Sequence, residues 1–242
     1  DGYIECVEEV FVTDAYHSLS IEGYRVSPDL IERVRLGDWN PDAITKDREH
    51  QDALAARGYW LAFNAVKDSV RAVLSNANPG EVVDADHSAW YRELFGPGVT
   101  AGIIQPADLA GYRSERVFIR NSMHTPLAPR AVSDAMSVFI EMLSAEENPA
   151  VRVVLGHFIF VYIHPYMDGN GRMGRFLMNL MLASGGYPWT VIPVERRNDY
   201  MAALEQASAY ENIEPFARFL GELVQNGIEG ASLPGIPESG AQ

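Results

Sequence analysis

Two strongly apolar segments near the middle of the chain are joined by a short loop rich in glycine and charge. Residues 153–163 read VVLGHFIFVYI and residues 176–183 read FLMNLMLA, and each is typical of a buried helix. The joining residues 164–175 read HPYMDGNGRMGR. Because this loop runs into the second helix, it places unpaired backbone N–H groups at a helix N-terminus, which attracts anions. The segment therefore predicts a helix-loop-helix that binds phosphate.

The glycines and arginines of the loop fit this prediction. Gly169 and Gly171 let the backbone approach a ligand closely, in conformations that other residues avoid. Arg172 and Arg175 are three residues apart, so they share one helix face and can grip neighbouring phosphates.

The remaining charged groups of the loop suggest catalysis. Asp168 could hold Mg²⁺, which usually binds through one or two carboxylates, water and phosphate oxygens. His164 could take a proton from an incoming hydroxyl near pH 7. An ordinary connecting loop with a capping Asp and solvated arginines would explain a lone Asp-Gly or a lone His. It does not explain all of these residue types within twelve positions.

At these residues the chain resembles the Fic family, whose motif is His-Pro-Phe-x-Asp-Gly-Asn-Gly-Arg-x-x-Arg. Every fixed position matches except the Phe, which is Tyr166 here. Residues 111–113 (GYR), 117–119 (VFI) and 124–126 (HTP) are similar to the family's flap hairpin and the turn after it. Residues 192–204 are similar to the segment that closes the nucleotide pocket. The resemblance covers residues 105–222 and implies a mostly α-helical, Fic-type bundle with a small β-hairpin flap.

The resemblance also implies an activity, the transfer of AMP from ATP to a Ser, Thr or Tyr hydroxyl of a target protein. His164 would act as the base, and Asp168 would hold Mg²⁺. Gly169, Asn170 and Gly171 would form an anion hole for the nucleotide, and Arg172 and Arg175 would bind its phosphates. Tyr200 would contact adenosine, with packing in the core as the alternative. The flap residues Val117, Phe118 and Ile119 would dock an extended segment of the target.

A second signature lies far upstream, where residues 18–23 read SLSIEG. They match the inhibitory motif (Ser/Thr)-x-x-x-Glu-(Gly/Asn) of the same family. Apolar residues at 4, 7, 10 and 11 predict a helix over residues 4–22, and Gly23 is suited to end it. The resemblance implies that Ser18 and Glu22 hold the enzyme in an inhibited state. Without it, Glu22 would be a solvated residue at a helix end.

Three functions remain open from the sequence. The first is the adenylyltransferase. The second is another nucleotide-dependent reaction on the same fold, namely phosphocholine transfer, phosphate transfer or removal of AMP. Phosphate-transferring relatives carry Lys after the Asn, where this chain has Gly171, whereas de-AMPylation stays open. The third is a catalytically silent protein-binding module, which would not need all the charged residues of the motif.

Composition limits the partners. The 242 residues carry a formal net charge of −14 with no Lys/Arg-rich run, which disfavours nucleic acid. The chain has one cysteine and no apolar run of about 18 residues, so we expect a cytoplasmic protein without a membrane partner. The expected partners are ATP, Mg²⁺ and a hydroxyl-bearing target protein, with a homo-oligomer left open.

The chain is expected to form one compact unit of three parts. These are an N-terminal helical region with the inhibitory helix (1–104), the catalytic core (105–222), and a helix end with a flexible tail (223–242). We expect a helix over 85–95 that ends at Gly96-Pro97-Gly98, and a strand over 117–123. Among the histidines, we expect His157 in the core, His17 on a helix surface, His87 near a helix cap and His124 at a hinge.

Overall fold

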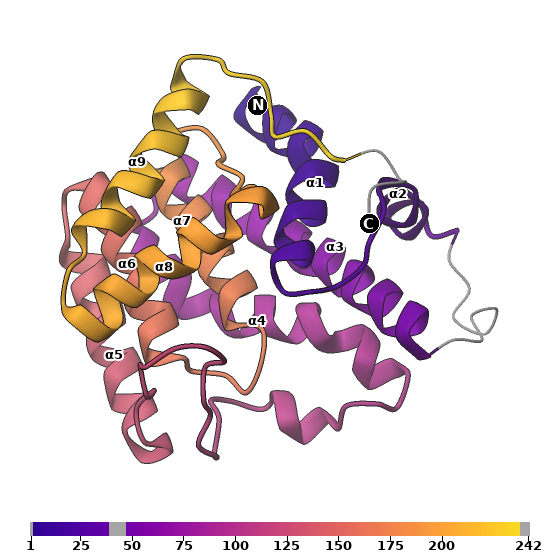
Figure 1. The fold of residues 1–242 in the computed structure, drawn as a ribbon, viewed down its shortest axis with the longest axis horizontal. Helices are drawn as coiled ribbons and strands as arrows, with labels where there is room; N and C mark the ends of the chain where they lie inside the picture. The colour runs from indigo at the N-terminus through magenta and orange to yellow at the C-terminus, as the bar shows by residue number, and fades with distance from the viewer. Residues whose placement is uncertain (1, 39–46, 238–242) are drawn as a thin grey trace.

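The fold is a bundle of helices. The structure is a computed structural model, which describes residues 2–38 and 47–237. The last five residues of the predicted tail, 238–242, lie outside the described residues. The helices are α1 (Gly2–Ile21), α2 (Pro28–Leu36), α3 (Asp47–Leu74), α4 (Pro79–Thr100), α5 (Pro129–Ala145), α6 (Pro149–Ile163), α7 (Asn170–Ser184), α8 (Arg197–Tyr210) and α9 (Glu214–Ile228) (Figure 1). Two short 3₁₀ helices, η2 (Pro106–Leu109) and η3 (Val194–Arg196), lie in the connections. Within the described ranges, no helix is long and apolar enough to cross a membrane.

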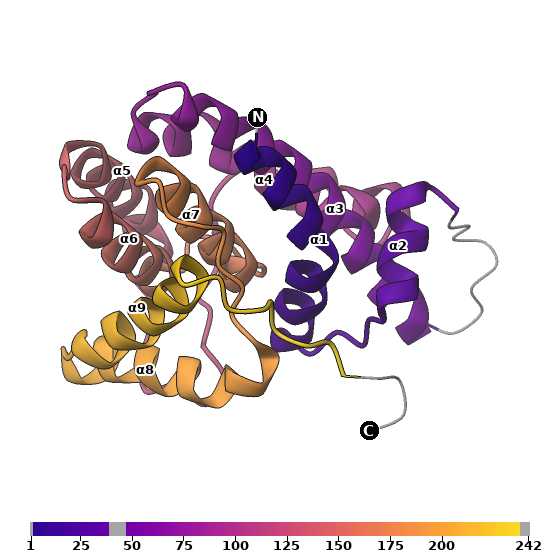
Figure 2. The ribbon, with the colours of Figure 1, turned by 90° about the horizontal axis from the view of Figure 1, so that it is seen from above.

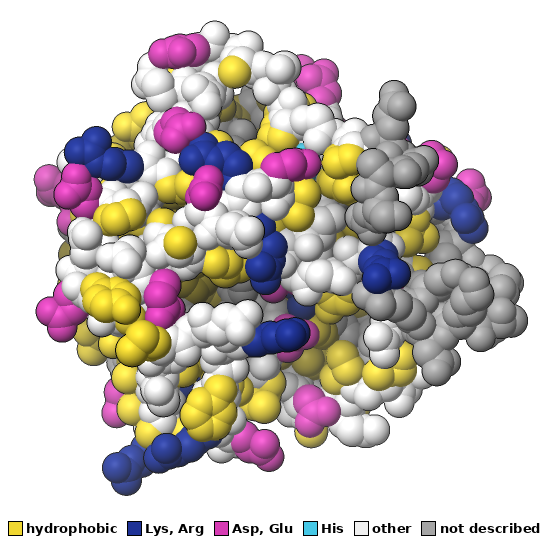
Figure 3. Space-filling model, viewed as in Figure 1, with side chains coloured by type: hydrophobic (Ala, Val, Ile, Leu, Met, Phe, Trp, Pro, Cys, Tyr) yellow, Lys and Arg dark blue, Asp and Glu magenta, His cyan; other side chains and the backbone are white. Residues whose placement is uncertain are grey.

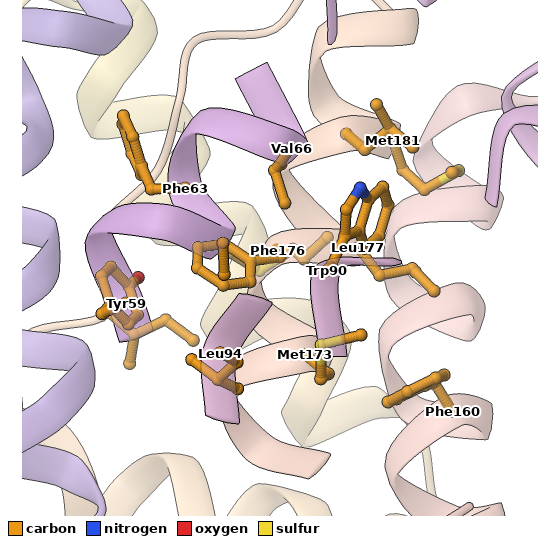
Figure 4. Packing of buried hydrophobic residues seen from close by; sticks show 14 of the residues in the cluster. Tyr59, Phe63, Val66, Trp90, Leu94, Phe160, Met173, Phe176, Leu177 and Met181 are labelled. Atoms are coloured by element: carbon orange, nitrogen blue, oxygen red, sulfur yellow. The ribbon is translucent and has the colours of Figure 1, made fainter. Parts of the chain in front are cut away.

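Helix α7 lies at the centre of the bundle and packs against α6, α3 and α4. It is buried almost throughout, as its apolar sequence predicts. Side chains from all four helices interlock there (Figure 4), among them Tyr59, Phe63 and Val66 of α3, Trp90 and Leu94 of α4, Phe160 of α6, and Phe176 and Leu177 of α7. Gly174 lets α6 approach closely, because a Cβ there would lie 2.8 Å from Val161. The core therefore holds the ends of α6 and α7 at a fixed separation.

Helix α1 contacts both α3 and α7, while α8 and α9 pack against each other on another side of the bundle (Figure 2). Helix α1 ends where the sequence predicts. Gly23 has φ +91°, its N–H donates to the Ser20 carbonyl, and the Tyr24 N–H donates to the Leu19 carbonyl. This is a Schellman ending, which makes Glu22 the C-cap residue directly after the helix and fixes its backbone. The helix after it, α2, begins with Ser27 as its cap, whose side chain accepts a hydrogen bond from the Leu30 N–H.

Helix α4 is longer than predicted at both ends. Asn78 caps its start by accepting hydrogen bonds from the N–H groups of Gly80 and Glu81. The prediction that the helix ends at Gly96-Pro97-Gly98 is wrong, because α4 continues to Thr100. Pro97 lies in the last turn, where it removes only one helical hydrogen bond. The chain then folds back, and Ile104 packs against Gly98, where a Cβ would lie 2.8 Å from its side chain. Tertiary packing thus outweighs the local break signal.

The strand predicted over residues 117–123 is not formed, and the part of the chain that the structure describes contains no strand. This segment is extended and then turns, with the Ser122 N–H donating to the Ile119 carbonyl and Asn121 at φ +61°. An isolated two-stranded hairpin is only marginally stable, and this segment has no neighbouring strand to pair with. The prediction of a small β-hairpin flap is therefore wrong: the flap is a loop without a β-ladder.

Charged side chains of both signs are interspersed over the face shown in Figure 3, with apolar side chains between them. The net charge of −14 is therefore not gathered into a single acidic patch on this face.

Candidate active site

The loop between α6 and α7 is held in shape by its own residues. The Asn170 side chain accepts from the Tyr166 N–H at 3.0 Å and donates to the Tyr166 carbonyl at 2.9 Å. Tyr166 is buried and stacks on Tyr91, with ring centroids 3.7 Å apart. Gly169 has φ +79°, and a Cβ there would lie 2.7 Å from the Phe95 ring, so glycine is required. The Asn170 side chain therefore braces the loop, and only its backbone N–H is available to an anion.

His164 ends α6 in the left-handed conformation, with φ +53° and ψ +62°. Its Nδ1 lies 3.2 Å from the Val161 carbonyl, which can only accept, so Nδ1 carries the proton. Burial lowers the pKa of His164, and the nearby Arg113 acts in the same direction. The ring is therefore neutral at pH 7, with the lone pair of Nε2 available to take a proton.

Helix α7 begins beside His164 with three N–H groups, of Asn170, Gly171 and Arg172, that have no carbonyl one turn earlier in the helix. The first helical hydrogen bond runs from the Met173 N–H to the Gly169 carbonyl. The carboxylate of Glu22 lies against this terminus, because a Cβ on Gly171 would be 2.3 Å from Glu22 Oε1. An anionic group from α1 thus lies at the terminus where the sequence predicts phosphate binding.

Arg175 is bound by α1 through both Ser18 and Glu22. Its Nε donates to Ser18 Oγ at 2.8 Å, and its Nη2 donates to the Ser18 carbonyl at 3.0 Å and to Glu22 Oε1 at 2.7 Å. Burial alone would raise the pKa of Glu22, but Arg175, Arg172 and Arg197 together lower it. Both partners of the ion pair are therefore charged at neutral pH.

Arg172 takes a different direction from Arg175. Its guanidinium lies between two rings, 5.2 Å from the centroid of Tyr24 and 5.1 Å from that of Phe95, and it pairs with Asp168 at 3.5 Å. Its Nε is buried without a hydrogen-bond partner. Tyr24 stands two residues after Glu22, so the end of α1 restrains both arginines of the loop. The contact with Tyr24 was not predicted, because that residue lies outside every motif.

Asp168 is the most accessible group of the loop, with 66% of its side chain exposed. One carboxylate oxygen accepts from the Gly169 N–H at 2.6 Å, and the other makes only the long contact with Arg172. No cluster of three or more potential metal ligands occurs among residues 2–38 and 47–237. A single accessible carboxylate fits Mg²⁺, which keeps several waters and takes its other ligands from substrate phosphates.

A cavity of about 330 Å³ lies beside the start of α7, whereas Asp168 and Arg172 line a separate pocket with Tyr24 and Phe95. Groups that can bind an anion line the cavity: His164, Gly171, Arg175 and Arg197, with Glu22 beside them. From α6, α8 and the flap come apolar and aromatic side chains, Phe158, Tyr162, Met201, Leu204 and Ile119, together with polar ones, among them Asn121, Ser122, Asn198, Glu205 and Ser208. The cavity thus combines anion-binding groups with apolar and polar side chains, as a nucleotide site requires.

The residues predicted to contact adenosine and the target lie at this cavity to different degrees. Tyr200 lines it, but its side chain is almost completely buried and its hydroxyl donates to His157 Nε2 at 2.7 Å. Ile119 also lines the cavity, whereas Phe118 is 78% exposed. Val117 is partly buried, so consecutive flap side chains alternate between inward and outward directions.

Two residues of α8 complete the site, although no motif indicated them. Arg197 donates to the Ile21 carbonyl at 2.8 Å and so holds the end of α1 at the cavity. Glu205 binds the turn of the flap by accepting from the Ser122 hydroxyl at 2.5 Å and from the Met123 N–H at 2.8 Å. Both contacts depend on how α8 packs against α1 and the flap, which the sequence of α8 does not indicate.

Comparison with known proteins agrees with this geometry. Residues 88–182, which include the loop and its two helices, match the model of the Fic/DOC family. This match covers the candidate site but less than half of the chain. It is 28% identical over 227 residues to a protein adenylyltransferase Fic of Nematostella vectensis, covering 92% of this chain and 49% of that protein. A protein adenylyltransferase Fic of Culex quinquefasciatus is also 28% identical, over 94% of this chain and 43% of its own length. The chain spans about half the length of the curated relatives it matches.

Solved structures of Fic proteins share the fold. Fic-1 (residues 134–508) from C. elegans superposes with a TM-score of 0.74 at 22% identity, covering 92% of this chain and 62% of that one. A Fic-domain signalling protein from Bacteroides thetaiotaomicron gives a TM-score of 0.71 at 17% identity, covering 96% and 92%. The prediction of a Fic-type helical fold is therefore confirmed.

Four histidines outside the loop are held by hydrogen bonds. His157 lies in the core as predicted and donates to the Gly174 carbonyl. The prediction that His17 lies on a helix surface is wrong, since it is buried and accepts from the Val194 N–H. The prediction of His87 near a helix cap is also wrong, because it bonds Val83 and Tyr112 from within α4. His124 donates to the Tyr162 carbonyl at the end of the flap.

Proposed function

We propose that this protein transfers AMP from ATP to a Ser, Thr or Tyr hydroxyl of a target protein, and that Glu22 keeps it inhibited. The main support is that a neutral His164, the N-terminus of α7 and Arg175 line one cavity. The relatives named protein adenylyltransferase Fic, which match over nearly the whole of this chain, support the same chemistry.

The reaction uses the side chains of the cavity as follows. The target hydroxyl gives its proton to His164 Nε2, and its oxygen attacks the α-phosphorus of ATP. The new phosphodiester bond forms as the bond to the pyrophosphate oxygen breaks, and pyrophosphate leaves. The N–H groups at the start of α7 stabilise the charge on the α-phosphate. Arg175 and Arg172 bind the outer phosphates once they are released from Glu22 and Tyr24. The part of the cavity lined by Met201 and Leu204 receives the nucleoside.

Asp168 is the residue that would hold Mg²⁺ in this site. The ion neutralises phosphate charge when it is bound. One carboxylate oxygen of Asp168 is nearly free. The other accepts a hydrogen bond from the Gly169 N–H, which fixes the orientation of the carboxylate. The carboxylate also lies close enough to Arg172 to hold that guanidinium near the same phosphates.

Glu22 inhibits through the position of its carboxylate. It is paired with the guanidinium of Arg175 and lies at the N-terminus of α7. The triphosphate needs both of these anion-binding groups. ATP then binds weakly or with its α-phosphate turned away from the attacking oxygen. A displacement of about 1 Å can lower a rate on the order of 10²-fold.

Intact-mass measurement tests the proposed activity. The protein and candidate targets are incubated with ATP and Mg²⁺, using wild type, Glu22→Gly and the double variant Glu22→Gly/His164→Ala. We expect a mass gain of one AMP with Glu22→Gly and none with the double variant. No gain with any protein would contradict the proposal. Loss of AMP from pre-modified targets, without any forward transfer, would instead identify a de-AMPylase.

A further inference from the structure

Arg113 is a buried residue that makes no contact with the cavity yet binds the loop that carries His164. It is 4% exposed, and its donors are used by main-chain carbonyls. Nε donates to His164 at 2.7 Å, Nη1 to Glu115 at 2.9 Å, and Nη2 to Leu127 at 2.6 Å and Ile163 at 3.5 Å. The Arg113 N–H donates to the carbonyl of the residue after His164, at 2.9 Å.

The choice of acceptors is unusual for a buried arginine, which is commonly paired with a carboxylate. Arg113 has no acidic partner within ion-pair distance among the described residues. The carbonyls of Ile163 and His164 are at the end of α6, where helical partners are missing and a positive charge is favourable. The guanidinium therefore serves to join backbone segments, since its planar fork can reach several carbonyls at fixed angles.

The joined segments are the two ends of the flap and the end of α6. Glu115 comes just before the flap residues 117–119, and Leu127 follows the flap, so both ends meet at one guanidinium. The same group binds the carbonyl of His164. The distance from the flap to His164 is therefore set through one side chain.

The backbone of His164 needs such a restraint. Its left-handed conformation is unfavourable for a residue other than glycine. Arg113 binds the carbonyls before and after the Cα of His164, and so it holds both peptide planes. The direction of the imidazole follows from these planes, since only one further hydrogen bond, from Nδ1 to Val161, holds the ring.

We propose that Arg113 is a positioning residue that holds the target-docking flap and the catalytic base at a fixed separation. This inference rests on the proposed function, in which a target segment lies along the flap. The guanidinium places the target hydroxyl within reach of His164 Nε2 without touching nucleotide or target. Its removal leaves the phosphate-binding groups of α7 in place, because none of them contacts Arg113.

Arg113→Lys tests the proposal, because an ammonium group cannot bind the same four carbonyls in one plane. The matched control is Arg152→Lys. Arg152 also donates to a main-chain carbonyl, that of Glu146 at 2.9 Å, and to Ser184 Oγ at 3.3 Å, but it does not line the cavity. Both substitutions are made in Glu22→Gly, and three quantities are compared: ATP affinity by calorimetry, the rate of self-modification at saturating ATP, and the NMR signals of the His164 ring.

We expect Arg113→Lys to lower the self-modification rate about 10²-fold, in line with the loss expected for misalignment. ATP affinity should change less than about twofold, while the NMR signals of the His164 ring and their pH titration shift. A lower rate with unchanged ATP binding indicates that the substitution acts on the transition state rather than on binding. Arg152→Lys should leave all three unchanged. Equal rates in the two variants, or a parallel loss of ATP affinity in Arg113→Lys, would overturn the proposal.

Two further outcomes are also decisive. If Arg113→Lys does not fold, Arg113→Gln replaces it in the same measurements; failure of both to fold beside a folded Arg152→Lys would assign Arg113 a purely structural role. If Glu22→Gly itself shows no AMP transfer, the proposed function fails. The His164 ring signals then still report whether Arg113 fixes that residue.

Discussion

Glu22 Oε1 and Arg175 Nη2 lie 2.7 Å apart although 153 residues separate them in the chain. The contact is fixed from both sides. The Schellman ending of α1 holds the backbone of Glu22, and two further hydrogen bonds from Arg175 to Ser18 hold the guanidinium. The pair therefore behaves as a built element of the site rather than as a surface ion pair between mobile side chains.

Replacing His164 by Ala in Glu22→Gly should abolish AMP transfer and leave ATP binding nearly unchanged. The imidazole meets the incoming hydroxyl, whereas the phosphates are bound by α7 and the arginines. Loss of a general base costs about 10²–10⁴ in rate. Calorimetry with ATP and Mg²⁺, beside a transfer assay with radiolabelled ATP, separates the two quantities. Full transfer activity in the variant would remove His164 from the mechanism.

Asp168→Ala should weaken ATP binding more in Mg²⁺ than in EDTA, since the carboxylate acts through the ion. The measurement is the ATP affinity of Glu22→Gly with and without the second substitution in both buffers. Asp168→Asn serves as the control for shape, because it keeps the size of the side chain and removes its charge. If the affinity fell equally in both buffers, Asp168 would be a loop-shaping residue only.

The low pKa of His164 predicts the pH dependence of transfer. Burial disfavours the imidazolium, so the base loses its proton below the ordinary value near 6.5. The single-turnover rate of Glu22→Gly should therefore be flat between pH 7 and 8 and decline only on the acid side of about pH 6.5. A rate that still rises tenfold per pH unit above pH 7 would show that another group is titrating.

His157 predicts a pH-dependent contribution to stability. Burial lowers its pKa to about 4, so the folded protein binds a proton less readily than the unfolded chain. Its contribution is complete above about pH 6.5 and is lost as the pH falls towards 4. The destabilisation caused by His157→Gln should thus be smaller at pH 4.5 than at pH 7, by about 2 kcal/mol. Burial raises the pKa of Asp14 to about 6, so this residue changes the stability in the opposite direction as the pH falls. Its effect is the same in wild type and in His157→Gln and cancels from the comparison. A pH-independent difference in urea unfolding would contradict this.

The parts of the fold set by local pattern could be predicted from the sequence. The apolar runs around the loop predicted α6 and α7, and Gly23 predicted the end of α1. The inhibitory role of Ser18 and Glu22 was expected from the family resemblance and not from any periodicity.

The rest depended on contacts between distant segments. Helix α4 continues through Pro97 because residues beyond it fold back onto Gly98, which no local signal indicates. The flap lacks a strand because strand formation needs a partner. Arg113 and Tyr24 act through carbonyls and rings that only the folded chain brings to them. For the same reason the position of Glu205 against the flap could not be foreseen.

The inhibitory contact is tested most directly by the ATP affinity and AMP-transfer rate of Glu22→Gly, measured against wild type and Glu9→Gly. Glu9 is an exposed residue on the same helix, so its substitution has the helix cost of glycine without touching the site. We predict that Glu22→Gly binds ATP more tightly and transfers AMP at a rate on the order of 10²-fold higher at saturating ATP, with ADP affinity changed less than ATP affinity. Glu9→Gly should match wild type in all three quantities. Equal transfer rates for wild type and Glu22→Gly at saturating ATP would contradict the account.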